Sequence, residues 1–597
     1  MSSSPLPYLR EDHLGGVRPA RRRRPPHRAG VGLVHGPPEG RGQGRSPVPA
    51  VRAMSAPLRV VIVGGIAGGM SAATRLRRLE ESADIVVFER GPEVSYANCG
   101  LPYYVGGVIE ERDALLLQTP ESLHRRFRLD VRVRHDVVGI DTARKTVEVV
   151  DLDSGHRSTH PYDRLVLATG ARPRGDEPTG ALPARSLRTV ADADAIAAAL
   201  RPGLPVVVVG GGYTGLEAVE NLVARGAAVT LVQRGAQLLA PLDPEMAAPL
   251  AAEVRRRGVD VRLGVEVVAT AADSVTLSDG ATLPAEFLVD ASGVVPEVGL
   301  ARAAGIRLGE TGGIAVDEAC RTSAPDVFAV GDGVEKTDLI GGGAALVTMA
   351  GLANRHGRMV ADVIAGREES ARPALGTGIV QMFGLAAAKT GWSEKQLRAG
   401  GRGFFAVHVH PASHAGYYPG AETLSMKLLA DPATDRILGA QIVGRDGVDK
   451  RIDVIATALQ AGVTASGLAH LELAYAPQFG SAKDAVNILG YVAENTRNGT
   501  TPTVQWHELD DALQAGSTLI DVRSVAEHTN GAIPGARNIP LDELRDRLDE
   551  LPDGPLVVHC QVGLRGHIAT RLLRQHGREV RNLDGGYRTW QDATAEC

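Results

Sequence analysis

The sequence contains few cysteines and few aromatic residues for a chain of 597 residues. Four cysteines are present, Cys99, Cys320, Cys560 and Cys597, and aromatic residues make up 4% of the chain. The cysteines are too far apart for a C-x-x-C redox pair or a zinc site, and they do not suggest a disulfide framework. This usage is typical of a reducing compartment and predicts a cytoplasmic protein. Cys320 and Cys597 lie in no supporting motif, so we assign them no role and expect no metal site.

The sequence also lacks an excess of positive charge and long apolar runs. Its formal net charge of -5 excludes a generally basic nucleic-acid binder. No uninterrupted apolar run of about 18 residues occurs, so no membrane span is expected. The length predicts about four domains of ~150 residues. Glycine is abundant, with 71 residues, and many follow Val/Ile runs, which indicates nucleotide-binding turns rather than disorder.

Residues 1–56 differ in composition from the rest of the chain. They are rich in Arg, Pro and Gly and show no sustained apolar period, so we expect a disordered extension. The basic run at 21–24 is not followed by the apolar core of a secretory signal. A nucleic-acid-binding arm is an alternative. Met54 stands just before the first expected strand and is an alternative start of translation, in which case residues 1–53 are not translated.

A first dinucleotide-binding pattern begins at residue 58. A β-branched run at 58–63 leads into a glycine-rich turn at 64–69 and then a helix, whose free N–H groups would face a pyrophosphate. Ile66 replaces the middle glycine of G-x-G-x-x-G. The strand at 84–88 ends at Glu89, where a carboxylate would bind ribose hydroxyls. An ordinary glycine turn is the alternative. The predicted cofactor contacts here are Gly64, Gly65, Ile66, Ala67, Gly68, Gly69, Glu89 and Arg90.

A second, complete G-x-G-x-x-G follows the strand at 205–209, and its predicted cofactor contacts are Gly210, Gly212, Tyr213 and Gly215. The next strand, at 228–232, ends at Gln233 and Arg234. NAD-specific enzymes place an acidic residue there, which would repel a 2′-phosphate. The missing carboxylate and Arg234 therefore favour NADPH over NADH. A solvated surface charge is the alternative reading of Arg234.

Two later stretches extend the pattern. Residues 162–170 read as a strand ending in Ala168-Thr169-Gly170, and residues 322–332 read as a strand ending in Gly331-Asp332. Together with the two glycine-rich turns, they resemble the two-dinucleotide flavoproteins of the pyridine nucleotide-disulfide oxidoreductase family. The resemblance implies that the chain binds FAD, that Asp332 contacts the ribityl chain of the flavin, and that these two stretches belong to the cofactor site.

The segment at 95–104, Ser-Tyr-Ala-Asn-Cys-Gly-Leu-Pro-Tyr-Tyr, follows the first nucleotide pattern. Gly100 and Pro102 favour an irregular backbone that opens a helix. A thiol at a helix N-terminus feels the positive end of the macrodipole, so the sequence predicts that Cys99 is biased towards thiolate. A small buried cysteine in a turn is the alternative.

Two tyrosine-containing clusters, at 413–420 and 475–484, read on their own as turns. With the Cys99 segment and the two dinucleotide sites, they make the region 58–492 resemble the coenzyme A-disulfide reductases. The resemblance implies a single redox cysteine, Cys99, working with FAD, and a homodimer formed by the C-terminal domain of the reductase. It implies further site residues: Ser95 and Asn98 lining the Cys99 pocket, Ser71, Arg75 and Arg78 meeting CoA, and Tyr417, Tyr475 and Lys483 coming from the partner subunit. The two arginines also suit CoA phosphates by charge alone, and a solvated basic helix face is the alternative.

The last hundred residues contain a second cysteine motif. The strand expected at 556–558 leads into His-Cys-Gln-Val-Gly-Leu-Arg-Gly at 559–566 and then a helix. Such a loop can turn several N–H groups onto the Cys560 sulfur, while Arg565 adds a fixed positive charge. A buried structural cysteine is the alternative, and a tyrosine phosphatase loop would need one more residue before the arginine. With Asp-Val-Arg at 521–523 and Leu-Asp-Gly-Gly-Tyr at 583–587, the segment resembles a rhodanese domain, which implies that Cys560 carries sulfur.

We therefore expect an α/β protein with two Rossmann-like dinucleotide-binding domains, an α+β dimerisation domain and a C-terminal rhodanese-like α/β domain. The expected boundaries are 57–170 with 301–371 for the FAD domain, 171–300 for the NAD(P)H domain, 372–492 for the dimerisation domain, 493–502 for a linker and 503–597 for the rhodanese domain.

The resemblances imply an FAD-dependent reductase that uses NADPH or NADH on CoA disulfide, CoA persulfide or polysulfide. CoA is then a substrate or a thiol linked to Cys99, and Cys560 presents sulfane sulfur to Cys99. Two alternatives remain: an NAD(P)H oxidase or peroxidase that cycles Cys99 through a sulfenic acid, and a sulfur-carrier or redox-sensing flavoprotein. The rhodanese-like segment speaks against the oxidase. Neither a nucleic acid nor a membrane is an expected partner.

Overall fold

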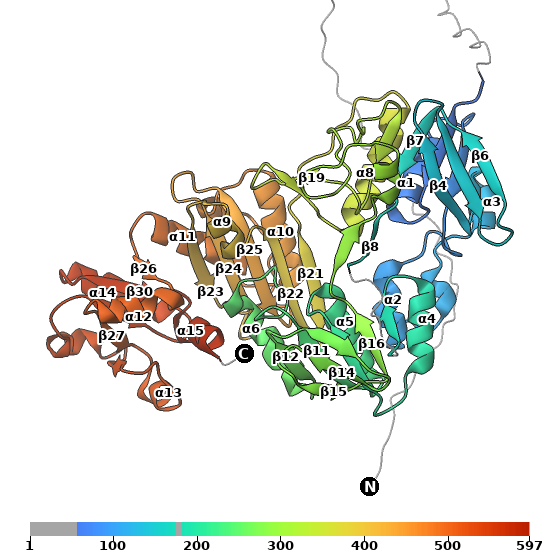
Figure 1. Ribbon diagram of the computed structural model, residues 1–597. Coiled ribbons are helices and arrows are strands. Elements are labelled where there is room, and N and C mark those ends of the chain that lie inside the picture. The colour runs from blue at the N-terminus through green and yellow to red at the C-terminus, as the bar shows by residue number, and fades with distance from the viewer. Residues whose placement is uncertain (1–55, 175–181, 596–597) are drawn as a thin grey trace, which may run out of the picture. The chain divides into compact units, whose positions relative to one another are not determined.

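The computed structural model describes residues 56–174 and 182–595. Within this range the chain forms four regions, each built around its own five-stranded sheet (Figure 1). The extension expected at 1–56 lies outside the described residues, except for Ala56. None of the helices in the described part is both long and apolar enough to span a membrane.

The first region is built on a parallel sheet with the strand order β18-β7-β1-β2-β3. A three-stranded antiparallel sheet, β4-β5-β6, packs against it through Val147 and Val149, which lie in one core with Leu165. Helices α1 and α8 cross in backbone contact, since a Cβ on Gly357 would lie 2.1 Å from the carbonyl oxygen of Gly68. The elements are β1 (Arg59–Val63), β2 (Asp84–Phe88), β3 (Asp130–Arg132), β4 (His135–Asp141), β5 (Thr146–Asp151), β6 (Arg157–Pro161), β7 (Arg164–Leu167), β18 (Val327–Ala329), β19 (Lys336–Thr337), β20 (Ala344–Ala345), α1 (Ala67–Arg77), α2 (Leu101–Val105), α3 (Pro120–Phe127), α7 (Gly299–Ala303) and α8 (Ala350–Ile364).

The second region repeats this design in the middle of the first. Its parallel sheet has the order β12-β11-β10-β16-β9, with a small antiparallel sheet, β13-β14-β15, attached. The chain enters along β8 and leaves along β17, which pair as an antiparallel ribbon. The elements are β8 (Ala171–Pro173), β9 (Ala184–Ser186), β10 (Pro205–Val209), β11 (Ala228–Gln233), β12 (Asp260–Leu263), β13 (Val267–Thr270), β14 (Ser274–Leu277), β15 (Thr282–Pro284), β16 (Phe287–Asp290), β17 (Val294–Pro296), α4 (Val190–Ala199), α5 (Tyr213–Ala224) and α6 (Pro244–Arg256).

The third region has an antiparallel sheet with the order β21-β22-β25-β24-β23. Strand β25 is buried along its whole length, because α10 and α11 pack with this sheet in one apolar core. The elements are β21 (Gly378–Met382), β22 (Leu385–Gly391), β23 (Phe405–Val409), β24 (Ser425–Ala430), β25 (Ile437–Gly444), α9 (Glu394–Ala399), α10 (Val448–Gln460) and α11 (Ala485–Arg497).

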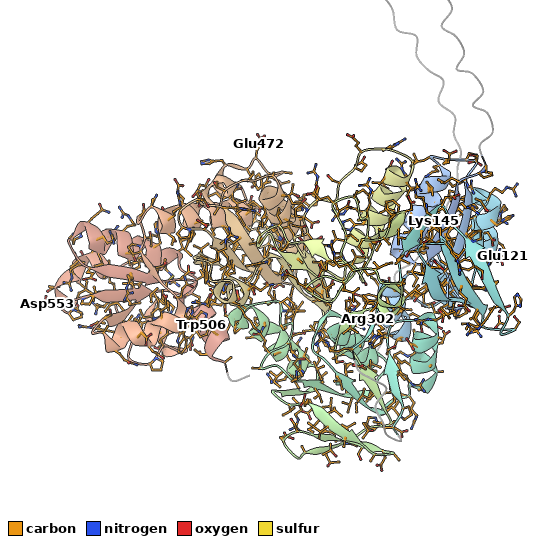
Figure 2. All side chains as sticks on the ribbon, turned by 45° about the horizontal axis from the view of Figure 1, so that its top comes forward. Glu121, Lys145, Arg302, Glu472, Trp506 and Asp553 are labelled. Atoms are coloured by element: carbon orange, nitrogen blue, oxygen red, sulfur yellow. The ribbon has the colours of Figure 1, made fainter. Side chains whose placement is uncertain are left out.

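The fourth region is again a parallel α/β unit, with the strand order β26-β30-β29-β27-β28. Trp506, labelled in Figure 2, lies in the short helix η4 (Trp506–Glu508) at its beginning. Helix η4 packs against α15, which packs against α6 of the second region. The elements are β26 (Thr503–Val504), β27 (Thr518–Asp521), β28 (Arg537–Asn538), β29 (Leu556–His559), β30 (Val580–Leu583), α12 (Leu509–Gln514), α13 (Val525–Thr529), α14 (Leu564–Gln575) and α15 (Gly586–Thr594).

The connection between the third and fourth regions is shorter than the composition suggests. Residues 493–502 were expected to form a linker because they contain Asn, Gly and Pro, but helix α11 continues to Arg497. Its apolar face, which includes the fully buried Leu489 and Ala493, packs into the core of the third region and extends the helix. This part of the linker prediction is wrong.

Candidate functional site

The turn between β1 and α1 has the geometry of a phosphate-binding loop. Gly64 has a φ of +103°, and a Cβ on Gly69 would lie 1.9 Å from the carbonyl oxygen of Gly64, so both positions require glycine. Ile66, in place of the middle glycine, is the N-cap of α1 with a φ of -106°, which any residue adopts. The first N–H groups of α1 are free of intrahelical partners and suit the pyrophosphate of a dinucleotide.

Three further segments reach the same edge of the first sheet, because β7 and β18 run parallel to β1 and β2. Glu89, directly after β2, accepts a hydrogen bond from Gly65 N through Oε2 at 2.8 Å. Arg90 follows and is exposed. The other two segments come after β7 and β18, and they are Ala168-Thr169-Gly170 and Gly331-Asp332. The structure therefore assembles the whole predicted FAD set at one sheet edge, where it fits a dinucleotide.

The second glycine-rich turn, between β10 and α5, is a close copy of the first. Gly210 has a φ of +105°, and a Cβ on Gly215 would lie 1.8 Å from the Gly210 carbonyl oxygen. Gly212 has open space around its Cα, and helix α5 begins at Tyr213. This turn also fits a pyrophosphate.

The two turns differ at the residue after the second strand, which is placed to bind the ribose of the dinucleotide. Gln233 accepts from Gly211 N through Oε1 at 2.9 Å, which is the bond that Glu89 makes in the first turn. A neutral amide thus replaces a carboxylate, and the neighbouring Arg234 is exposed to solvent.

Cys99 lies on a segment fastened to both dinucleotide turns. On one side, Ser95, with a φ of 49°, donates its backbone N–H to the carbonyl of Gly65 at 2.8 Å. On the other, Tyr103 donates its hydroxyl to Glu217 Oε1 at 3.2 Å, and Glu217 belongs to α5. The thiol is exposed and lies 3.8 Å from Asn98 Oδ1. The chain thus places a lone, accessible sulfur between the two nucleotide sites.

The expected electrostatic activation of Cys99 is wrong. Partial burial, followed by the negative charges of Glu217 and Asp332, raises the pKa of the Cys99 thiol above its ordinary value. The helix that Gly100 and Pro102 open, α2, is only five residues long, so its dipole is weak. The influence of Asp332 also shows that the thiol lies near the predicted flavin site.

Of the three residues expected to meet CoA, Ser71 and Arg75 lie on α1 and Arg78 is its C-cap residue. Their side chains differ in whether another residue of the chain already binds them. Ser71 donates to Asn354 Oδ1 at 2.6 Å. Arg75 forms a bidentate pair with Asp362, at 3.0 and 2.7 Å, which ties α1 to α8. Arg78 is exposed and lies over the ring of Phe127. Of the two arginines, Arg78 is the one whose charge is available to a phosphate.

The tyrosines predicted to serve the partner subunit form an exposed pair in the third region. The hydroxyls of Tyr417 and Tyr475 are 3.0 Å apart, and their residues are 77% and 50% exposed. Lys483 is exposed on the same segment as Tyr475. Phe479 is also exposed, at 71%. Clustered exposed aromatics are typical of a protein interface.

The second cysteine occupies a different kind of site. Cys560 follows β29 and is buried, and its sulfur accepts the N–H of Gly563 at 3.1 Å. Gly563 has a φ of +103°, which turns this N–H inwards and opens α14. The Cys560 sulfur is among the groups that raise the pKa of Arg565, after the larger effect of its hydrogen bond to Glu527. One N–H of the loop thus reaches the sulfur, where the sequence predicts several.

Three residues that contact the predicted sites are not among the residues that the sequence predicts. Glu217 sets the charge beside Cys99. Glu527 holds Arg565 at 2.7 and 2.6 Å, and these hydrogen bonds keep its own pKa at about 2. Lys336 is buried and donates to the carbonyl oxygens of Gly331 and Val334, which fixes the turn carrying Asp332. Only Glu527 had a sequence signal, since Ser524-x-x-Glu527 is a capping box at the start of α13.

Comparisons with known proteins agree with this architecture. Residues 58–351 match the model of the pyridine nucleotide-disulphide oxidoreductase family, residues 379–486 its dimerisation domain, and residues 505–593 the rhodanese-like domain. The chain is 34% identical over 445 residues to a coenzyme A disulfide reductase of Staphylococcus aureus, covering 73% of this chain and 100% of that protein.

Two solved structures resemble nearly the whole described chain. Reduced CoADR-RHD of Bacillus anthracis is 42% identical with a TM-score of 0.88, covering 91% of this chain and 99% of that one. An NAD-dependent persulfide reductase from A. fulgidus is 36% identical with a TM-score of 0.83, covering 89% and 100%. The expected fold class is confirmed. The chain belongs to the pyridine nucleotide-disulphide oxidoreductase family and carries a rhodanese-like domain at its C-terminal end.

Proposed function

We propose that the protein is an FAD-dependent NAD(P)H reductase of CoA disulfide and CoA persulfide, with a fused rhodanese-like domain that carries sulfur. The observation that carries this proposal is the lone thiol of Cys99 between the two dinucleotide turns. Of the other cysteines in the described residues, Cys320 is buried in the first region and Cys560 belongs to the fourth. No protein sulfur pairs with Cys99 within the described chain, so a small-molecule thiol completes the redox couple.

In the reaction, the Cys99 thiolate attacks one sulfur of CoA disulfide, which breaks the S–S bond, forms a Cys99–CoA mixed disulfide and releases one CoA thiolate. The residues at the edge of the first sheet, Glu89 and Asp332 among them, would hold FAD, which would supply the electron relay between NAD(P)H and this mixed disulfide. The second CoA then leaves and Cys99 is a thiolate again. In sum, NAD(P)H, one proton and CoA disulfide give NAD(P)⁺ and two CoA thiols.

With CoA persulfide the same balance gives one CoA thiol and one hydrogen sulfide. Cys560 carries the sulfane sulfur as a persulfide. Its transfer to the Cys99 thiolate breaks the S–S bond on Cys560, leaves a Cys560 thiolate and gives a Cys99 persulfide, whose two-electron reduction with NAD(P)H releases hydrogen sulfide. The Gly563 N–H and Arg565 stabilise the anion on Cys560. The names of the relatives support both substrates, since they are a coenzyme A disulfide reductase and a persulfide reductase.

The remaining site residues keep their predicted roles in this proposal. Ser95 and Asn98 line the Cys99 pocket. Arg78 supplies the charge that binds a CoA phosphate, with Ser71 and the Asp362-paired Arg75 beside it in the CoA site. Tyr417, Tyr475 and Lys483 act across a homodimer, which the family's dimerisation domain and the exposed aromatics support. Gln233 and Arg234 favour NADPH, because no carboxylate repels its 2′-phosphate. The free cysteines fit a cytoplasmic enzyme.

The test is a substrate panel with CoA disulfide, CoA persulfide, oxygen and peroxide, run with NADPH and with NADH. We expect nicotinamide oxidation with both CoA substrates and hydrosulfide release with the persulfide. Cys99→Ser should abolish both, whereas Cys560→Ser, its matched control, should retain CoA disulfide reduction. Hydrosulfide release that persists in Cys99→Ser would overturn the proposal, and a preference for oxygen or peroxide would replace it with an oxidase or peroxidase.

A further inference from the structure

A buried histidine joins three regions of the chain at one point. His408, on β23 of the third region, is 3% exposed. Its Nδ1 lies 2.7 Å from Asp584 Oδ2 of the fourth region, and its Nε2 lies 3.1 Å from Glu245 Oε1 on α6 of the second region. Both ring nitrogens face carboxylates, so the ring donates at both only when it is protonated. One imidazolium therefore bridges the second and fourth regions.

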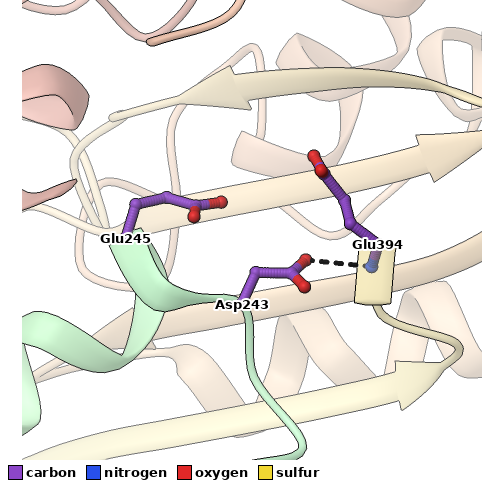
Figure 3. A group of neighbouring side chains, drawn as sticks. All are labelled: Asp243, Glu245 and Glu394. Carbon is purple, nitrogen blue, oxygen red and sulfur yellow. Dashed lines mark hydrogen bonds between the residues drawn. The ribbon is translucent and has the colours of Figure 1, made fainter. Parts of the chain in front are cut away.

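The surroundings of His408 favour the charged ring. Asp243, Glu245 and Glu394 converge at the junction of the second and third regions, with Asp243 accepting the backbone N–H of Glu394 (Figure 3). The ammonium of Lys427 lies among them, at 2.9 Å from both Asp243 and Glu394 and hydrogen-bonded to Glu245. Lys427 thus occupies the place that a metal ion would take between these carboxylates.

The balance of charge around the histidine is negative. The negative groups around it are the carboxylates of Asp243, Glu245, Glu394 and Asp584. The positive group among them is the ammonium of Lys427. His410 follows directly after the end of β23, and Arg588 lies near His410. Burial opposes the charge on His408, but the hydrogen bonds to Asp584 and Glu245 outweigh it and raise the pKa of His408 to about 9.

Asp584 connects this junction to the sulfur-carrier loop. It is followed by two glycines, and a Cβ on Gly585 would lie 2.9 Å from the Cβ of His408, so the turn packs directly on the histidine. The next residues hold the cysteine loop: Tyr587 N donates to the Cys560 carbonyl at 2.8 Å, and Arg588 N donates to the Gln561 carbonyl at 3.0 Å. A continuous chain of contacts therefore runs from Glu245 through His408 and the Asp584 turn to Cys560.

We propose that His408 is a positioning residue for the sulfur-carrier site, because it fixes the Asp584 turn, and through it the Cys560 loop, against the NAD(P)H-binding region. This inference rests on the proposed role of Cys560 as sulfur carrier. It adds that the geometry of Cys560 depends on a residue of the dimerisation domain, outside the rhodanese-like fold. The carrier domain is thereby held in one docked position in which its loop is shaped for transfer.

The chain offers a matched control two residues away. His410 also links β23's end to the fourth region, with Nε2 at 2.8 Å from Thr589 Oγ1, and its Nδ1 lies 3.1 Å from Ser425 Oγ. Its partners are hydroxyls, and burial lowers its pKa to about 3, so it is neutral. Replacing His410 removes a similar ring and similar hydrogen bonds but no charge bridge to the Asp584 turn.

The experiment uses the full-length, FAD-loaded enzyme with His408→Gln, Asp584→Asn, the double variant and His410→Gln. Sulfur transfer from thiosulfate to cyanide reports on Cys560, and NAD(P)H-dependent reduction of CoA disulfide reports on Cys99. We expect kcat/KM of transfer to fall roughly tenfold in either single variant and no further in the double one. The pH profile of Cys560 alkylation by iodoacetamide should shift in the same variants. CoA disulfide reduction, and both activities of His410→Gln, should stay unchanged.

Transfer and alkylation profiles in His408→Gln that equal those of His410→Gln would overturn the inference. If His408→Gln does not fold, the result for Asp584→Asn is sufficient, because this variant removes the carboxylate charge of the same pair from the fourth region and leaves the buried cluster occupied. Cys560→Ser separates the two proposals: if it retains transfer, the carrier role and the inference both fall, and if it is inactive while His408→Gln is fully active, only the inference falls.

Discussion

The two cysteine sites differ in the exposure of the sulfur and in the charges around it. Cys99 is exposed, and its site combines segments of the first and second regions. The negative charges of Glu217 and Asp332 disfavour its thiolate form. Cys560 is buried in a single loop, with the N–H of Gly563 on its sulfur and Arg565 beside it. The comparison shows an accessible sulfur beside negative charges in the first site, and a buried sulfur beside an N–H donor and an arginine in the second. We call the first three regions the reductase half and the fourth region the carrier half. Substitutions in one half should therefore change the activity of that half and leave the other activity unchanged.

The largest expected effect is on the carrier half. Arg565→Ala removes the positive charge next to Cys560, and by analogy with the loss of one anion-stabilising donor we expect sulfur transfer from thiosulfate to fall about a hundredfold. CoA disulfide reduction should be unaffected. Arg574→Ala, an exposed position on the same helix α14, is the control. A loss of both activities, or of neither, would break the separation of the two halves.

A smaller effect should be confined to the reductase half. Gln233→Glu gives the second turn the carboxylate that Glu89 supplies to the first, and this charge would repel a 2′-phosphate. We expect kcat/KM for NADPH to fall about tenfold, which is about 1.4 kcal/mol, and that for NADH to change little. Steady-state kinetics with both nucleotides measure it. Equal losses with NADPH and NADH would show that residue 233 does not select between them.

A smaller effect is expected on the pKa of the Cys99 thiol. Glu217→Gln removes the negative charge that has the larger effect of the two on the pKa of the Cys99 thiol, so the pKa should fall and the thiolate should form at lower pH. The rate of iodoacetamide alkylation of Cys99 against pH, in a Cys560→Ser background, measures this shift. Glu111→Gln, at an exposed glutamate of the first region, which also contains Cys99, should leave the profile unchanged. A profile that moves to higher pH would contradict the charge account.

Much of this architecture was predictable because it is local in sequence. The strands at 84–88 and 205–209, both glycine-rich turns and the loop around Cys560 depend on short-range patterns, and the structure places them where the sequence does. The pKa of Cys99 was not predictable, since Glu217 is remote in sequence and reaches the thiol only through the packing of α2 on α5. The same holds for Lys336, whose partners are defined by a turn and not by a motif.

The junction between the halves was invisible in the sequence for the same reason, and it gives the smallest predicted effect. The pKa of His408 is about 9 in the folded chain, above its ordinary value of 6.5. Folding therefore favours the protonated ring, and this contribution is complete below pH 6.5 and lost as the pH rises through 9. The contribution is on the order of 3 kcal/mol, so wild type should exceed His408→Gln in Tm by about 3 °C at pH 6.5 and by less above pH 9.

Differential scanning calorimetry of both proteins across this pH range measures the difference. His410→Gln should show a difference from wild type that does not vary with pH, because the neutral ring of His410 releases no proton there. A difference for His408→Gln that stays constant, or grows with pH, would mean that the ring is neutral and that the bond to Asp584 is an ordinary hydrogen bond. The two halves would then be joined by packing alone, and the Cys560 loop would owe nothing to the charge of the junction.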